Sequence, residues 1–260
     1  SKHPVEADLV GISFSYQENQ AFYIPLGHVL ITETKAETEI EDEVEVETGA
    51  KPAAKIVQPT KEDIIRILRP LLENPDIHKV GQNIKYDYIV LARFGITLQG
   101  IVFDTMIASY LLNPTSRGHS LDSIAMSLFG HKTTTYEEVA GKGKNQKGFQ
   151  EVPLSLAVDY ACEDADLTFM AYKRLKKDIQ KLELQNLMNS IEVPLITVLA
   201  KMEMEGIKVD QAVLQELSNT FEQELKKLEQ EIFDLAGEIF NINSSKQLGT
   251  ILFEKLKLET

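Results

Sequence analysis

The sequence lacks several features that would place it in particular protein classes. It has one cysteine in 260 residues, Cys162, which excludes an internal disulfide and a cysteine-built zinc site and suits a reducing cytosol. No stretch approaches the roughly 18 consecutive apolar residues of a membrane-spanning helix, and the residues from Ser1 to Pro4 are not typical of a signal peptide. The sequence therefore predicts a cytoplasmic chain without membrane spans.

Positive charge is also scarce. The chain has 27 Lys and Arg residues against 40 Asp and Glu residues, which gives a net charge of −13 and a pI of about 4.9. So acidic a chain is poorly suited to binding nucleic acid through bulk electrostatics alone. If it acts on DNA or RNA, we expect the contact to be local, with metal ions supplying the positive charge.

The acidity is concentrated in one segment. Residues 33–51 contain eight acidic residues and two lysines, and thus −6 of the net charge of −13. Like charges at this density repel each other, which predicts a solvated, flexible insertion over residues 33–54. A metal-binding acidic loop is the alternative interpretation.

Strand-like and helix-like segments alternate in the first half, and helices dominate afterwards, which predicts an α/β layer followed by an all-helical part. We expect a hairpin from residues 8–16 and 21–25, short strands at 77–81 and 101–103, and helices at 60–71, 84–94, 104–112, 153–180, 183–204 (kinked at Pro194), 211–236 and 246–256. The predicted domains are residues 1–182 and 183–260.

The first candidate site is the segment from Gly81 to Asp87, where a strand ends and a helix begins. Ligands bind beyond the carboxyl ends of strands in open α/β sheets. There, the Asp87 carboxylate can hold a hard cation, and Gln82 and Asn83 can hydrogen-bond a substrate. The alternative is purely structural: Asp87 as a first-turn acid favoured by the helix dipole, and Asn83 as an N-cap.

The second candidate site lies in the segment from Asp159 to Asp166. Tyr160 and Asp164 are four residues apart and share one helix face. Asp164 can bind Mg²⁺ or Mn²⁺, and Tyr160 can orient an attacking water. Glu163 and Asp166 fall on other faces and are expected to be solvated. An acidic helix surface without function is the alternative.

Taken together, the motifs resemble those of the 3′–5′ proofreading exonuclease domain of family A DNA polymerases, the bacterial DNA polymerase I family. The matching segments are residues 10–14, 23–28, 79–87, 103–106, 121–124, 136–146 and 160–166. Residues 203–210 and 240–248 resemble the start of the polymerase region, the base and arm of its thumb. The palm and fingers are absent from the sequence, so we expect no DNA synthesis by this chain.

The resemblance implies a ribonuclease-H-like mixed sheet with flanking helices and a site for two Mg²⁺ or Mn²⁺ ions, which would stabilise the attacking and leaving oxygens at phosphorus. Asp87 and Asp164 match two of the family's four metal-binding carboxylates, and Tyr160 matches the tyrosine that positions the nucleophilic water. The residues that match contacts to the single-stranded 3′ end of DNA are Gln82, Asn83, Tyr86 and Tyr136. Tyr136 can stack on any base, although core packing is the alternative for it and for Tyr86.

The sequence departs from the family at its first motif. An Asp-x-Glu pair on the first strand is expected ahead of Val10, but only Glu6 and Asp8 lie there, and neither is expected to replace it. We therefore expect a chain that begins after the first strand of a longer parent protein, with one metal position weak or empty and exonuclease activity impaired or absent.

Three functions remain open on the sequence alone. The first is the proofreading exonuclease. The second is a non-catalytic module that holds DNA, with a vestigial site. The third is an RNA exonuclease of the ribonuclease D type, which shares the Tyr-x-x-x-Asp helix but which the thumb-like segment at 244–248 disfavours. In that segment, Ser244, Ser245 and Lys246 can contact a duplex phosphate, or Ser244 can be only a helix cap.

Overall fold

The computed structural model describes residues 3–29 and 58–258, and the acidic insertion predicted at residues 33–54 lies outside them. The chain forms two compact units, of which the first ends at Glu205 and the second begins at Gly206. Within the described residues, no helix combines the length and apolar character that crossing a bilayer would require.

The strands of the first unit form two small sheets. An antiparallel hairpin joins β1 (Gly11–Gln17) to β2 (Gln20–Pro25), and β3 (Lys79–Gly81) pairs in parallel with β4 (Ile101–Asp104). The predicted hairpin and short strands are thereby confirmed. The single mixed sheet is not formed by the described strands, because β1 and β3 are not paired with each other.

Helices make up most of the first unit, and their starts follow the local sequence. Thr60 caps α1 by accepting from the Asp63 amide, and Ser120 caps α4 through Ser123. The α-helices are α1 (Lys61–Leu72), α2 (Ile84–Arg93), α3 (Thr105–Leu112), α4 (Leu121–Phe129), α5 (Tyr136–Ala140), α6 (Leu154–Lys181), α7 (Gln185–Leu187) and α8 (Val193–Glu205). Short 3₁₀ turns, η1 (Gly143–Asn145) and η2 (Phe149–Glu151), and a π-helical turn, η3 (Met188–Glu192), complete the unit.

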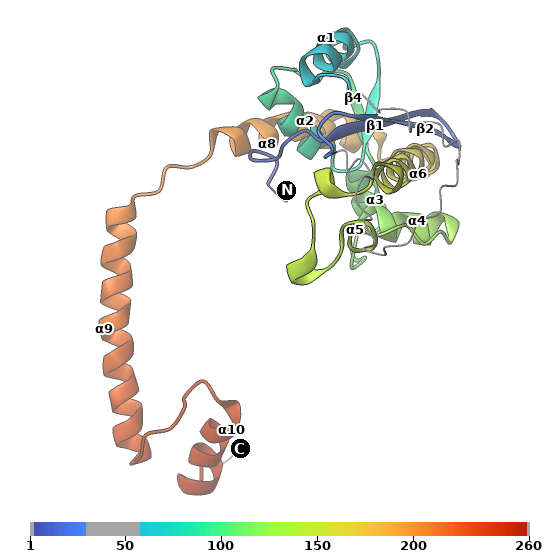
Figure 1. The fold of residues 1–260 in the computed structure, drawn as a ribbon. Helices are drawn as coiled ribbons and strands as arrows, with labels where there is room; N and C mark the ends of the chain where they lie inside the picture. The colour runs from blue at the N-terminus through green and yellow to red at the C-terminus, as the bar shows by residue number, and fades with distance from the viewer. Residues whose placement is uncertain (1–2, 30–57, 259–260) are drawn as a thin grey trace, which may run out of the picture. The chain divides into compact units, whose positions relative to one another are not determined.

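The helices cover both faces of the strands, with α1 and α2 on one side and α3, α4 and α6 on the other (Figure 1). On the first side, Ile89 of α2 and Ile196 of α8 share a buried core. On the second side, Phe103 of β4 packs with Ala171 and Leu175 of α6. The long helix α6 contacts both hairpin strands and β3, so it brings its side chains close to both sheets.

Helix α8 belongs to the first compact unit, and the domain division at residues 182–183 stays a prediction. Ile196 and Ala200 of this helix are 3% and 0% exposed and pack against α2. The kink predicted at Pro194 coincides with the start of α8, directly after the π-helical turn η3.

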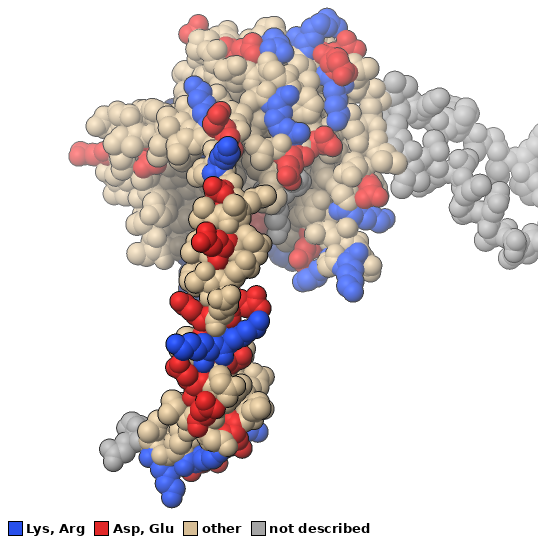
Figure 2. Space-filling view, turned by 90° about the vertical axis from the view of Figure 1, so that its left-hand side faces the viewer, with Lys and Arg blue, Asp and Glu red and all other residues tan. Residues whose placement is uncertain are grey.

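The second unit is helical. Its main element, α9 (Gln211–Ala236), has the predicted bounds; Asp210 caps its start, and Gly237 ends it at a φ of 72°. The predicted last helix is divided into α10 (Ser245–Gly249) and a π-helical segment, η4 (Thr250–Lys255). Acidic and basic side chains are interspersed along α9 (Figure 2), and its apolar stripe is exposed: Leu214, Leu217, Phe221, Leu225 and Leu228.

Candidate functional site

The first candidate site is built around a buried carboxylate at the end of β4. Asp104 is 1% exposed and accepts hydrogen bonds from the amides of Ile84 (2.7 Å), Met106 (2.8 Å) and Ile107 (3.2 Å). It therefore caps α2 and α3 together, which is possible because parallel β3 and β4 end at the same edge. This fixes the first turn of α2, which carries Asp87.

Asn83 does not cap α2, contrary to the structural alternative considered above. Its backbone is in the left-handed region, at φ 55° and ψ 45°, and its side chain makes no capping hydrogen bond. Asp104 supplies that cap instead. Asparagine tolerates this backbone conformation better than most residues, so the turn explains the residue type as well as a substrate contact would.

Asp87 lies on the first turn of α2 and is accessible to solvent. Desolvation raises the pKa of its carboxyl to about 7, and the nearby charge of Asp104 adds to the shift. Because water still reaches the group, solvent screens part of this effect. A carboxylate whose charge is disfavoured by its surroundings, and which remains accessible, is a suitable ligand for a cation.

Gln82 has a structural role, because its side chain makes two hydrogen bonds within the first unit. Its side-chain amide donates to the carbonyl of His119 (2.8 Å), and its oxygen accepts from the hydroxyl of Thr105. It thus ties the β3–α2 turn to α3 and to the α3–α4 connection. The role of Gln82 as a substrate contact stays a prediction.

The second candidate site lies on α6, where Tyr160 and Asp164 share one face, as predicted from their spacing. Desolvation raises the pKa of Asp164 to about 7; a hydrogen bond from Tyr160 opposes the rise, while Asp122 and Glu163 add to it. The same surroundings raise the pKa of Tyr160, first through desolvation and then through Asp164. Tyr160 therefore stays protonated and donates to the carboxylate.

Aromatic rings surround Tyr160. The centroid of Phe149 lies 5.8 Å from that of Tyr160 and 6.2 Å from that of Tyr136, and Tyr136 meets Tyr160 edge-on at 6.4 Å. His28 packs on Phe149, and its Nε2 is 2.6 Å from the hydroxyl of Tyr23. Phe149 was not predicted from the sequence, although a single aromatic residue within the polar stretch 141–151 was the available signal.

Glu163 and Asp166, predicted to be solvated, are partly exposed, and both also accept hydrogen bonds from other segments of the unit. Glu163 accepts from Nε2 of His131 (2.7 Å) and from the amide of Thr134 (2.9 Å). Asp166 accepts from the amide of Asn19 in the hairpin turn (2.8 Å). Both acids therefore join α6 to other segments, and neither was expected to do so because their partners are remote in sequence.

The structure thus joins Tyr136, Tyr160 and Asp164 in one group, and places Asp87 beside Asp104 in another. The charged groups that shift the pKa of Asp87 are not those that shift the pKa of Asp164. Within residues 3–29 and 58–258, no cluster of three or more His, Cys, Asp or Glu side chains could hold a metal. The two groups are connected by the contact between α6, which carries Tyr160 and Asp164, and β3, which leads into α2 and Asp87.

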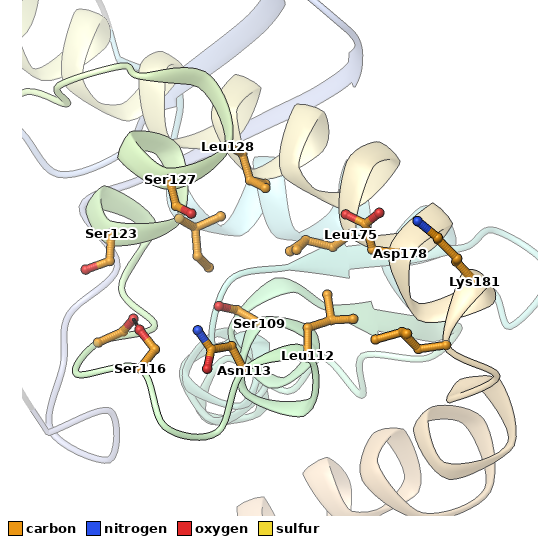
Figure 3. A pocket seen from close by; sticks show the side chains of 13 residues that line it. Ser109, Leu112, Asn113, Ser116, Ser123, Ser127, Leu128, Leu175, Asp178 and Lys181 are labelled. Carbon is orange, nitrogen blue, oxygen red and sulfur yellow. Dashed lines mark hydrogen bonds between the residues drawn. The ribbon is translucent and has the colours of Figure 1, made fainter.

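A pocket in the described part of the chain lies away from these residues. It has a volume of about 380 Å³ and is bounded by α3, α4 and the end of α6. Serines 109, 116, 123 and 127 gather at one end, with Leu175, Asp178 and Lys181 of α6 at the other (Figure 3). None of the predicted site residues lines it, so the candidate chemistry does not depend on this pocket.

Comparison with known proteins gives consistent results. A model of the 3′–5′ exonuclease family matches residues 3–180, and one of DNA polymerase family A matches residues 211–260. DNA polymerase I of Pseudomonas aeruginosa is 37% identical over 97% of this chain and 26% of its own length, and that of Treponema pallidum is 37% identical over 98% and 27%. The chain therefore spans about a quarter of the length of these relatives.

Among solved structures, the chain resembles the POL domain of Pol1 from M. smegmatis, determined in complex with DNA primer-template and dNTP. The TM-score is 0.63 and the sequence identity 25%, over 77% of this chain and 31% of that one.

Proposed function

The chain belongs to the 3′–5′ exonuclease family, and from this premise we propose that it carries the proofreading region of a family A DNA polymerase, which removes nucleotides from the 3′ end of DNA. The observation that carries the proposal is the hydrogen-bonded pair of Tyr160 and Asp164 on α6, together with Asp87 on the first turn of α2. The resemblance of both sites to the family's motifs supports it.

The donor set fits a hard divalent cation. Asp87 and Asp164 offer carboxylate oxygens, and Mg²⁺ is commonly held by one or two carboxylates, with substrate phosphate and water completing its shell. We propose that these two aspartates hold Mg²⁺ or Mn²⁺ in the active protein. When bound, the ion supplies the positive charge at the scissile phosphate that a chain of net charge −13 lacks.

The other side chains are assigned complementary roles. The hydroxyl of Tyr160, held protonated by its surroundings, orients the attacking water beside Asp164. Tyr136 is 38% exposed, and its ring offers a face for the terminal base, which is stacked without regard to sequence. Gln82, Asn83 and Tyr86 contact the single-stranded 3′ end, with Gln82 also holding the turn in place.

We further propose that the two small sheets belong to one ribonuclease-H-like sheet completed by a strand between them. Support comes from α6, which packs on both sheets, and from the parallel pairing of β3 with β4. The family places its Asp-x-Glu pair on such a strand. In the proposed site, Asp87 and Asp164 match two of the family's four metal-binding carboxylates.

The second unit is assigned to the base and arm of the polymerase thumb. Ser244 caps α10 by accepting from the amide of Gln247, while Ser245 and Lys246 are exposed. A contact from Ser244, Ser245 and Lys246 to duplex phosphate stays a prediction.

A nuclease assay tests the proposal. A version extended at its N-terminus by an Asp-x-Glu strand is incubated with single-stranded DNA labelled at the 5′ end, with Mg²⁺, with Mn²⁺ or with EDTA. We expect stepwise loss of 3′ nucleotides only with a cation, and its loss in Asp164→Asn. No release under any condition would favour a non-catalytic DNA-holding module, and faster trimming of matched RNA would favour a ribonuclease D-like enzyme.

A further inference from the structure

The segment that joins α4 to α5 is fastened on both sides by carboxylates. We call residues 131–135 the α4–α5 strap. Glu163 of α6 accepts from Nε2 of His131 at 2.7 Å and from the amide of Thr134 at 2.9 Å. Asp122 of α4 accepts from the hydroxyl of Thr133 at 2.7 Å. Three of the five strap residues are therefore held by two acids on two different helices.

The strap determines where Tyr136 lies. Thr135 caps α5 in a reciprocal pair with Glu138, whose carboxylate accepts from the Thr135 amide at 2.6 Å, and Tyr136 is the first residue of the helix. A helix of five residues is not stable in isolation. The position of the Tyr136 ring, 6.4 Å from that of Tyr160, thus depends on the segment that precedes it.

The bonds that hold the strap are partly shielded from solvent, and that of Thr133 is the most buried. The side chain of Glu163 is 21% exposed, and Thr133 is 4% exposed. A buried donor or acceptor that loses its partner is penalised more heavily than an exposed one. One arrangement of the strap is therefore strongly preferred, although α5 itself has few contacts with the rest of the unit.

We propose that Glu163 is a positioning residue for the substrate. Through His131 and Thr134 it sets the aromatic ring of Tyr136 beside the Tyr160–Asp164 pair, and Asp122 fixes the middle of the same strap through Thr133. The substrate class is the single-stranded 3′ end of DNA, so the inference rests on the proposed function. In the proposed complex, Asp164 binds the cation, and Glu163, the residue before it, acts only through the strap.

The absence of tryptophan from the sequence allows a direct test. Tyr136→Trp introduces a single fluorescent indole at the position of interest, and its quenching by acrylamide and its anisotropy are measured in the full chain without DNA or cation. We expect Glu163→Ala to increase the quenching and lower the anisotropy of this indole. We expect Glu137→Ala to change neither, because Glu137 pairs at the surface with Lys142 at 3.1 Å and does not bond the strap.

A second readout separates positioning from a general structural effect. His131→Ala should increase the quenching of the indole less than Glu163→Ala does, because the bond from Thr134 to Glu163 remains. The double variant should show no more quenching than Glu163→Ala alone, because His131 acts on the strap through its bond to Glu163. Circular dichroism monitors folding. If Glu163→Ala does not fold, Glu163→Gln, which keeps one acceptor for the two donors, replaces it in the same comparison.

Binding completes the test. In EDTA, a fluorescent oligothymidylate should bind Glu163→Ala about five- to tenfold more weakly than the parental chain, since base–aromatic stacking contributes about 1–3 kcal/mol per base. Equal shielding of the indole with and without Glu163→Ala would overturn the positioning role. Increased quenching of the indole with unchanged binding of the oligothymidylate would overturn the link between the position of Tyr136 and substrate binding. A loosened indole and weaker binding, without nucleotide release by the extended protein, would support positioning and reject the exonuclease assignment.

Discussion

At the scale of single residues, Asp104 shows how one buried carboxylate organises a site. Three backbone amides from two helices donate to it, and desolvation, only partly opposed by these bonds, raises its pKa. The side chain thereby caps the first turns of α2 and α3. In doing so, it fixes the position of Asp87. It acts through the backbone and needs no contact with substrate.

Replacement of Asp104 should be strongly destabilising. We expect Asp104→Ala to lower the free energy of unfolding by roughly 2–4 kcal/mol, because two helix caps are lost and buried amides lose their acceptor. Urea denaturation followed by circular dichroism measures the change. Asp76→Ala, at an exposed position, should stay within about 0.5 kcal/mol. A small effect at Asp104 would mean that the turns hold without it.

His28 should make the stability of the first unit depend on pH. It is 6% exposed, its Nδ1 has no hydrogen-bond partner among the described residues, and desolvation lowers its pKa, partly offset by the backbone of Val152. The unfolded chain thus binds the proton more readily than the folded one. Stability is fully present above the unfolded pKa, about 6.5, and is lost as the pH falls through the lower folded pKa.

Denaturation at pH 7.5 and at pH 5.5 tests this expectation. The parental chain should lose more stability between the two values than His28→Gln, whose side chain keeps a polar group near Tyr23 and does not titrate. Other acids contribute equally to both proteins, so the difference between them reports on His28. Identical losses would contradict a buried, neutral histidine.

At the scale of elements, α8 is held by a few apolar contacts to α2. Ile196→Ala should cost roughly 2–4 kcal/mol, since it leaves a cavity in the core that Ile89 and Ala200 share. Val198→Ala, on the exposed side of the same helix, should cost less than about 0.5 kcal/mol. Thermal unfolding of both variants compares them. Equal, small effects would place α8 outside the cooperative unit and restore the boundary expected near residue 182.

Most elements could be predicted because their signals are local. Thr60 caps α1, Gly95 follows α2, and the apolar period of residues 211–236 matches α9. The packing of α8 against α2 depends instead on contacts between residues about a hundred positions apart. The partners of Glu163 were missed for the same reason: spacing along one helix shows which residues share a face, but not what a distant loop donates to another face.

At the scale of the whole molecule, the two units are joined by residues 206–210. Gly206 has a φ of 73° and Ile207 is 92% exposed, so this segment offers little protection to its backbone. Among the sites in the described residues, trypsin should cut first after Lys208, and mass spectrometry identifies the products. An earlier cut within α8 or α9 would show that a helix opens more readily than the connection.

The charge of the whole chain makes a cation central to its proposed role. On the face shown in Figure 2, basic and acidic side chains are mixed without a broad basic patch. The net charge of −13 leads us to expect that a DNA end is held locally. Two aspartates from distant segments, with pKa values raised to about 7 by their surroundings, are the groups we expect to bind the ion. The roles proposed for Tyr160 and Tyr136 depend on both aspartates binding the same ion.

A titration with Mn²⁺, in which electron paramagnetic resonance measures the free ion, tests the shared cation site most directly. We predict that Asp87→Asn and Asp164→Asn each weaken the tightest site by at least about tenfold, given that even outer-shell changes at metal sites cost about 10–100-fold. The double variant should be no weaker than either, and Asp159→Asn, exposed on the same helix, should bind as the parental chain does. Unchanged binding in either single variant would contradict a shared cation site.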